Sequence, residues 1–292
     1  MVECGLASDE ASSNGRAVSI IRASVDRARS AVSKYNDKTA EAERNQKKKL
    51  IAGCIPPLTE CYFANKVPSS VNNLMPEYTV VLSTLLDCHV DILLAETLST
   101  TREAIAILRS LSSIHEQMGR VKAGHTIPPI WMSFTIHDDS PTKLRSDELL
   151  ETACNSIIQE SDYLNLPLEA VGINCSAPRA ISKAVPILTR ILEGTSIKVC
   201  AYGNCFKTTT SEWISSLDDN GDSVDSTSIT TDKTVCGEVS ICVGDYDEEG
   251  YLVPDAYAKY TSEWAKSGAQ IIGGCCGSRP KHMAKVINNT CC

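Results

Sequence analysis

Long apolar runs are absent from this sequence, and so is any surplus of positive charge. No stretch approaches the roughly 18 uninterrupted apolar residues of a membrane-spanning helix, so we expect no membrane partner. The opening MVECGLASDEASSNGR has early acids and lacks a basic segment followed by an apolar one, which disfavours a secretory signal. The net charge of -8 disfavours nucleic acid as a partner, because phosphate backbones attract clustered Lys and Arg. These absences predict a soluble, cytoplasmic protein.

Cysteine, in contrast, is plentiful. The 292 residues contain 14 cysteines, scattered along a chain that is too long for a small disulfide-stabilised scaffold. In a reducing compartment, such cysteines are typical of free thiols or of a metal site.

Short apolar segments alternate with longer helical patterns along most of the chain. The predicted strands lie at 50–57, 90–97, 128–136, 169–175, 196–202 and 269–274. The predicted helices lie at 17–49, 76–88, 100–117, 146–163, 180–192, 254–267 and 280–288. This alternation indicates parallel βα units, with helices outside the sheet, in either a barrel or a doubly wound sheet. Six strands can be counted, whereas a closed barrel of this kind needs about eight.

The predicted domain organisation is simple. Residues 1–16 are expected to be a flexible N-terminus, and residues 17–290 a single α/β domain. Within it, residues 208–249 are polar, acidic and rich in Ser, Thr and Asp, which predicts a long loop or insertion. The segment TVCGEVSICVGDY, at 234–246, could form a small hairpin inside that loop.

Two predicted strands end in cysteine. Cys175 closes VGINC, and Cys275 and Cys276 follow IIGG. Because the carboxyl ends of parallel strands share one rim of the sheet, where ligands and catalytic groups gather, the three thiols are expected to meet there. Three thiolates with an open fourth position are typical of a catalytic zinc, although buried free thiols remain the alternative. Gly273 and Gly274 would let the backbone turn sharply beside the metal.

The segments VGINCSAP and IIGGCCGSRPKHM resemble the zinc-dependent homocysteine S-methyltransferases, supported by DILLAET and PIWMSF. The resemblance covers roughly residues 50–286 and implies a TIM-type (β/α)8 barrel with Cys175, Cys275 and Cys276 as the ligands of Zn2+. It also implies that a methyl group moves from a sulfonium donor, S-methylmethionine or S-adenosylmethionine, to the thiol of homocysteine, giving methionine. Both partners would then be small molecules.

The resemblance also implies substrate-binding residues. Glu96, at the end of LLAET, matches an acid on the rim of the family's barrel and would contact the substrate amino group. Asn204 in AYGNC resembles a YPN element, with Gly203 where the family has proline, and Asn174 would orient a neighbouring ligand. The run 137–139, His-Asp-Asp, also follows a strand, where a polar loop is favoured over a second metal site.

The sequence departs from the family at its start. The family begins with a strand carrying an Asp-Gly-Gly element and then a second βα unit, and neither is found here, so the chain is predicted to lack the first two βα units. Three explanations fit: an incomplete version of a longer protein, an edge covered by another subunit in a homo-oligomer, or a zinc site without turnover. The rivals to the methyltransferase are therefore a non-catalytic zinc-binding remnant of the barrel and a structural protein without metal.

Overall fold

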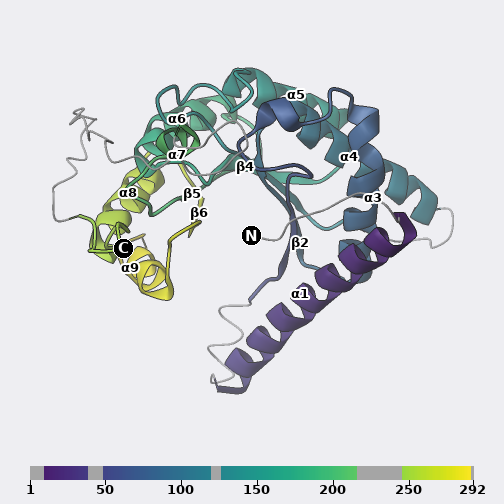
Figure 1. The fold of residues 1–292 in the computed structure, drawn as a ribbon, viewed down its shortest axis with the longest axis horizontal. Coiled ribbons are helices and arrows are strands. Elements are labelled where there is room, and N and C mark those ends of the chain that lie inside the picture. The colour runs from purple at the N-terminus through teal and green to yellow at the C-terminus, as the bar shows by residue number, and fades with distance from the viewer. Residues whose placement is uncertain (1–9, 39–48, 120–125, 216–244, 291–292) are drawn as a thin grey trace. The chain divides into compact units, whose positions relative to one another are not determined.

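The computed structural model describes residues 10–38, 49–119, 126–215 and 245–290 (Figure 1). The chain divides into two compact units, the first formed by Met1–Met132 with Ser156–Glu169 and the second by Ser133–Asn155 with Ala170–Cys292. The strands of the described residues follow the order of the chain, from β1 to β6. The pairs β1–β2, β4–β5 and β5–β6 are parallel. The predicted α/β fold with six strands is therefore confirmed.

The elements fall close to their predicted places. The strands are β1 Ala52–Ile55, β2 Ile92–Leu98, β3 Ile130–Phe134, β4 Leu168–Asn174, β5 Lys198–Gly203 and β6 Ile271–Gly274. The helices are α1 Glu10–Lys38, α3 Val71–Asp87, α4 Thr101–Gly119, α5 Leu150–Tyr163, α6 Pro178–Ile191, α7 Thr210–Ser215, α8 Pro254–Lys266 and α9 Pro280–Thr290, with a 3-10 turn, η1, at Ala64–Lys66.

Three boundaries differ from the predictions. Helix α1 begins at Glu10, so part of the expected flexible N-terminus is helical. Helix α3 begins at Val71, several residues before the Pro76 that was expected to start it. Helix α7 lies inside the segment 208–249 that was expected to be a loop. The predicted hairpin at 234–246 falls almost entirely outside the described residues. The extent of a single domain over 17–290 stays a prediction.

In the first unit, helices α3 and α4 pack on each other, and α1 packs along α3 (Figure 1). Strand β1 approaches α3 so closely that a Cβ on Gly53 would lie 2.8 Å from Leu85 Cδ2. Helix α4 begins with a capping box, because Glu103 N donates to Thr100 Oγ1 while the Glu103 carboxylate accepts from Thr100 N. Local caps and close backbone packing thus fix the helices of this unit.

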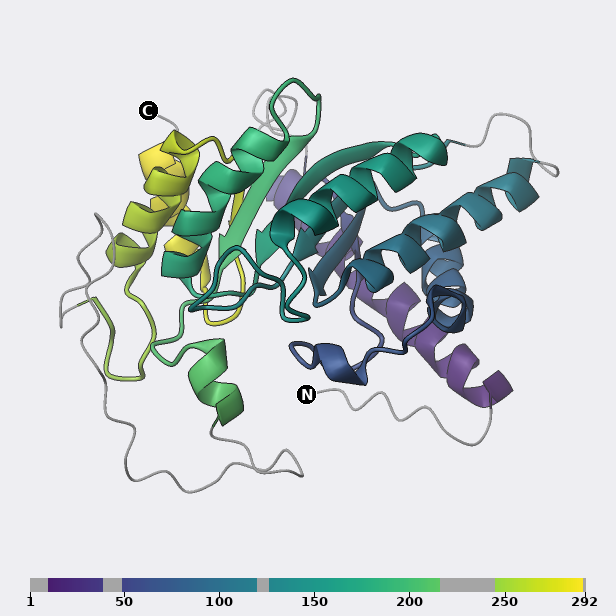
Figure 2. The same cartoon turned by 90° about the horizontal axis from the view of Figure 1, so that it is seen from above.

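In the second unit, α6 and α8 pack together and contact strands β5 and β6, respectively (Figure 2). Trp264 is fully buried in this layer, and its Nε1 donates to Ser182 Oγ at 3.0 Å. The register places Asn174 beside Tyr202, and Gly203 beside Gly274. The carboxyl ends of β4 and β6 therefore come level on either side of the end of β5.

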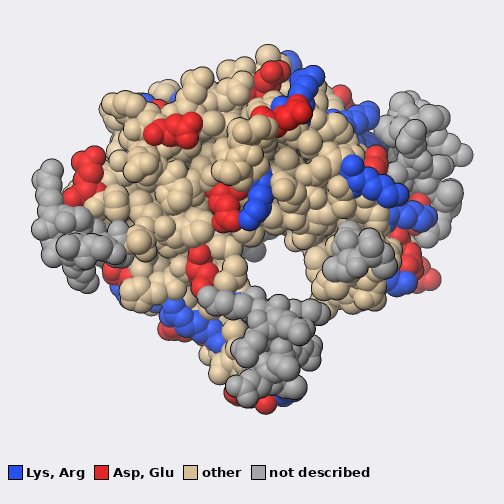
Figure 3. Space-filling model, turned by 180° about the vertical axis from the view of Figure 1, so that it is seen from behind, with Lys and Arg blue, Asp and Glu red and all other residues tan. Residues whose placement is uncertain are grey.

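Charges of both signs are mixed on the surface. On the face drawn in Figure 3, Lys and Arg side chains alternate with Asp and Glu. Ion pairs among the described residues include Arg109 Nε with Glu160 Oε1 at 2.6 Å and Lys285 Nζ with Asp255 Oδ1 at 2.7 Å. Among the described helices, none is both long and apolar enough to cross a membrane.

Candidate metal centre

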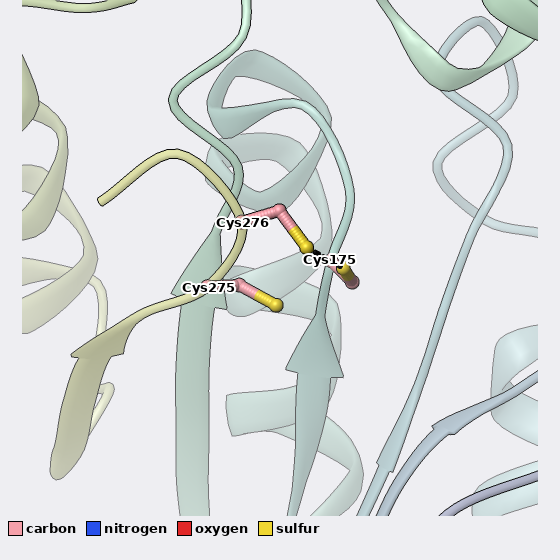
Figure 4. Close-up of side chains that lie close together, drawn as sticks. All are labelled: Cys175, Cys275 and Cys276. Carbon is pink, nitrogen blue, oxygen red and sulfur yellow. Dashed lines mark hydrogen bonds between the residues drawn. The ribbon is translucent and has the colours of Figure 1, made fainter. Parts of the chain in front are cut away.

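Three cysteine sulfurs converge at the carboxyl ends of β4 and β6. Cys175 directly follows β4, and Cys275 and Cys276 directly follow β6, so the two turns face each other across the end of β5. The three Sγ atoms all lie within 4.8 Å of one another, and Cys175 Sγ is 3.4 Å from Cys276 Sγ (Figure 4). The three thiols therefore lie together at this rim, as the positions of the strand ends predicted.

The backbone at Cys175 adopts a left-handed conformation, with φ of 50°. Such a conformation costs a non-glycine residue about 1–3 kcal/mol, so neighbouring contacts must hold it in place. Cys175 N donates to Tyr202 O at 3.1 Å. Ser176 Oγ accepts from Ile136 N and donates to Asn174 O, which fastens the turn to the loop after β3 and to its own strand.

A buried ion pair supports the same turn from the β3 loop. Arg145 Nη2 lies 3.1 Å from Asp138 Oδ2, and the two side chains are 2% and 0% exposed. The other carboxylate oxygen, Asp138 Oδ1, accepts from Ala177 N at 3.0 Å. Asp138 of the run 137–139 thus supports the turn at Cys175, and its partner Arg145 was not predicted from the sequence.

The second turn is held by backbone bonds to β5 and the segment after it. Cys275 N donates to Gly203 O at 3.0 Å, and Cys205 N donates to Cys276 O at 2.8 Å. Gly273 and Gly274 belong to β6, and the left-handed glycine of the turn is Gly277, with φ of 76°. The assignment of the sharp turn to the first two glycines was therefore wrong, because the chain reverses only after both cysteines.

Aromatic rings leave no room for a side chain at Gly277. A Cβ there would lie 2.9 Å from Tyr251 Cδ1 and 3.2 Å from Phe206 Cε1. Tyr257 supports the preceding strand, since its phenol donates to Gly273 O at 2.8 Å. The turn that carries Cys275 and Cys276 is therefore packed on one side and hydrogen-bonded on the other.

The thiols influence one another's ionisation strongly. Hydrogen bonds from Cys175 and Cys275 lower the pKa of Cys276 to about 3. The pKa of Cys175 is raised by its hydrogen bonds with Cys275 and Cys276 and by burial. Adjacent thiolates repel one another, so the cluster without a metal ion favours a single thiolate. A cation at the centre of the cluster would favour three thiolates.

The cluster suits a soft or borderline metal ion. A tetrahedral zinc with Zn–S bonds of about 2.3 Å separates its sulfurs by about 3.8 Å. The sulfurs here span that separation, with one pair at 3.4 Å and every pair within 4.8 Å. Thiolate ligands select zinc over magnesium or calcium, which prefer oxygen. Three sulfurs leave a fourth tetrahedral position for another molecule.

The three predicted substrate-binding residues lie in different settings. Glu96, in β2 of the first unit, is half-buried and hydrogen-bonds the Cys54 thiol, whose pKa is raised by burial and by that carboxylate. Asn174 is fully buried beside the cluster. Asn204 is 7% exposed, and its Oδ1 has no hydrogen-bond partner among the described residues. Their roles toward a substrate stay predictions.

Two further residues take part in the site without having been expected. Ser133 Oγ lies 2.6 Å from Tyr202 Oη and donates to Asn174 Oδ1 at 2.9 Å. Ser133 belongs to PIWMSF and Tyr202 to AYGNC, two segments that take part in the family resemblance. Ser133 and Tyr202 could be assigned to the site only once the order of β3, β4 and β5 in the sheet was known.

Fold and site together define an α/β protein with a cluster of three cysteines, able to hold a metal ion, at the carboxyl ends of its strands. The model of the homocysteine S-methyltransferase family matches residues 5–290. This chain therefore belongs to the homocysteine S-methyltransferase family.

Known relatives are similar at a distant level. The chain is 26% identical over 196 residues to a selenocysteine methyltransferase of Astragalus bisulcatus, covering 67% of this chain and 43% of the relative. It is 23% identical over 252 residues to the homocysteine S-methyltransferase YbgG of Bacillus subtilis (strain 168), covering 84% and 63%. The chain thus spans less than two thirds of these curated relatives.

Solved structures of the homocysteine methyltransferase MmuM from Escherichia coli share the fold. The oxidised form aligns with a TM-score of 0.63 at 20% identity, covering 94% of this chain and 72% of MmuM. The metallated form aligns with a TM-score of 0.62 at 20% identity, covering 94% and 71%. The fold of this chain is therefore that of a larger known methyltransferase structure, of which it matches most.

Proposed function

We propose that this chain binds zinc through Cys175, Cys275 and Cys276 and transfers a methyl group from a sulfonium donor to homocysteine. The convergence of three sulfurs within 4.8 Å of one another carries the proposal, because ordinary packing does not require three thiols so close together. The family supports homocysteine as the acceptor. The metallated form of MmuM supports a metal in the family's fold.

Zinc, when bound, supplies a Lewis acid that holds the homocysteine sulfur as a thiolate near neutral pH. The three cysteines would hold that ion and leave one position open to the substrate sulfur. In the transfer, a lone pair of the homocysteine sulfur forms a bond to the methyl carbon. The bond from carbon to the donor's positive sulfur breaks, its electron pair stays on that sulfur, and a neutral thioether leaves. The acceptor becomes methionine.

Asn204 is the described residue best suited to bind the substrate amino group near the cluster. Its backbone lies between two contacts to the cysteine turn, since Gly203 O accepts from Cys275 N and Cys205 N donates to Cys276 O. Its buried Oδ1 is an acceptor without a partner among the described residues, and such a group costs about 1–3 kcal/mol until it is satisfied. A substrate ammonium would supply the missing donor. Glu96, with carboxylate acceptors beyond the one facing Cys54, is proposed as a second contact.

The test begins with purification without a chelator and a measurement of zinc per chain. Methionine formation from homocysteine is then followed with S-methylmethionine and, separately, S-adenosylmethionine. Cys275→Ser should lose both zinc and turnover. Cys54→Ser is the matched control for zinc content, because Cys54 is a free thiol that lies outside the cluster. Folded protein without zinc would contradict the proposal.

A second candidate is a zinc-binding remnant of the same fold without catalytic activity. The abundance of cysteines, 14 in 292 residues, favours it, because most of these thiols lie outside the cluster. One zinc per chain without methionine formation from either donor would select this alternative.

A further inference from the structure

A chain of hydrogen bonds runs through the second unit from a phenol to a metal-ligand candidate. Tyr202 Oη and Ser133 Oγ are 2.6 Å apart, and Ser133 Oγ is 2.9 Å from Asn174 Oδ1. Asn174 Nδ2 lies 3.9 Å from Cys275 Sγ, within the longer reach of a sulfur acceptor. Ser133 and Asn174 are both fully buried. Three neighbouring strands, β3, β4 and β5, each contribute one of these polar side chains.

The donor and acceptor roles along this series of hydrogen bonds decide which end of the Asn174 amide faces Cys275 Sγ. A serine hydroxyl has one proton, and an amide has a donor end and an acceptor end. If Tyr202 donates to Ser133, and Ser133 donates to the amide oxygen, the NH2 group faces Cys275. With every bond reversed, the amide oxygen would face Cys275 instead. Only the first arrangement offers a donor to a thiolate, and only the second offers an acceptor to a neutral thiol.

We infer that Ser133 and Tyr202 are positioning residues, which orient the Asn174 amide so that its N–H supports Cys275 as a thiolate metal ligand. The inference rests on the proposed metal centre. A buried amide with its oxygen toward a thiolate would place two acceptors face to face, an arrangement that low-polarity surroundings make costly. Mutation of a residue that hydrogen-bonds a metal ligand typically lowers metal affinity by about 10 to 100-fold.

Zinc affinity, measured by competition with a chromophoric chelator, tests the inference directly. Ser133→Ala removes the proton that fixes the amide, and we expect a loss of about 10-fold or more. Asn174→Asp keeps the shape but replaces the donor with a carboxylate oxygen, so the largest loss is expected there. Tyr202→Phe removes only the phenol oxygen and should give a smaller loss in the same direction.

Ser182→Ala is the matched control. Its hydroxyl is also bonded inside the second unit, donating to Glu263 Oε2 at 2.9 Å and accepting from Trp264 Nε1 at 3.0 Å, but no described contact joins it to the cysteines. This variant should lose stability and retain the zinc affinity of the wild type. Cobalt substitution adds a spectroscopic readout, because near-ultraviolet absorption from sulfur to cobalt should weaken or shift in Ser133→Ala and remain unchanged in Ser182→Ala.

The outcomes separate this inference from the proposed function. If Ser133→Ala and Asn174→Asp bind zinc with the same affinity as the wild type, the positioning role of Ser133 and Tyr202 is refuted and the proposed metal centre stands. Wild-type protein that binds no zinc would overturn both. If Ser133→Ala does not fold, Tyr202→Phe and Asn174→Asp decide the matter, and unchanged affinity in both would refute the inference.

Discussion

Asp138→Asn tests whether a buried ion pair holds the turn that carries Cys175. The variant keeps the size of the side chain and an oxygen for Ala177 N, but it removes the negative charge. Arg145, with a side chain that is 2% exposed, would then keep a positive charge without its carboxylate partner. Breaking one side of a buried pair costs about 3–5 kcal/mol. For a chain of this size, that corresponds to a fall of roughly 10 °C in melting temperature.

The assay is thermal unfolding followed by circular dichroism, with Asp255→Asn as the control. Asp255 pairs with Lys285 at the surface, where the side chains are 68% and 48% exposed, so its loss should cost no more than about 1 kcal/mol. Adding Arg145→Gln to Asp138→Asn should recover much of the stability, because the buried positive charge that lost the Asp138 carboxylate is then removed. An Asp138→Asn protein that melts within about 2 °C of the wild type would refute the reasoning.

Three further predictions concern single positions. Gly277→Ala should lower the melting temperature more than Gly250→Ala does. Both glycines have positive φ, but a Cβ at Gly277 would lie 2.9 Å from a ring carbon, whereas a Cβ at Gly250 would lie 4.0 Å from its nearest neighbour. Equal falls in melting temperature would contradict this. His137 has a pKa lowered by burial and then by a nearby guanidinium, so the unfolded chain binds the extra proton and stability falls as pH drops below roughly 6.5. His137→Asn should flatten that dependence, measured as melting temperature from pH 7 to 5, and an unchanged slope would exclude this role. Thr100→Ala removes the partner of Glu103 in the capping box and should cost about 1 kcal/mol in urea unfolding while leaving zinc affinity unchanged; a loss of affinity would show that the cap serves the metal centre.

Much of the fold could be predicted because buried parallel strands are short continuous apolar runs. Each of the six predicted strand segments overlaps one strand of the structure, and the ends of β2, β4 and β5 lie one residue outside the predicted segments. Pro76 was misleading, because proline favours the first turn of a helix. Helix α3 instead begins after Ser70, which accepts from Asn72 N, and buried Leu74 and Tyr78 on either side of the proline favour a continuous helix.

The cysteines could be predicted from their places at strand ends, but their supports could not. Arg145 lies seven positions after Asp138 in the sequence, and Tyr202 lies 69 positions after Ser133. Side chains that meet through strand order leave no periodic mark in a sequence. The role of Gly277 was also not predicted, because the sharp turn was assigned to the two glycines before the cysteines, whereas the left-handed glycine follows them.

The spacing of the cysteines has a consequence for the chain between them. Cys175 and Cys276 are 101 residues apart, so an ion held by both would close a loop of that length. In the chain-entropy model of a disulfide, a cross-link that closes a loop of about 100 residues stabilises the folded state by about 4.7 kcal/mol, because it lowers the entropy of the unfolded chain. Because each doubling of a loop adds only about 0.6 kcal/mol, the polar segment inside it could lengthen or shorten at little entropic expense. The ion would then act as a detachable cross-link, and the sequence between its ligands would be free to vary in length.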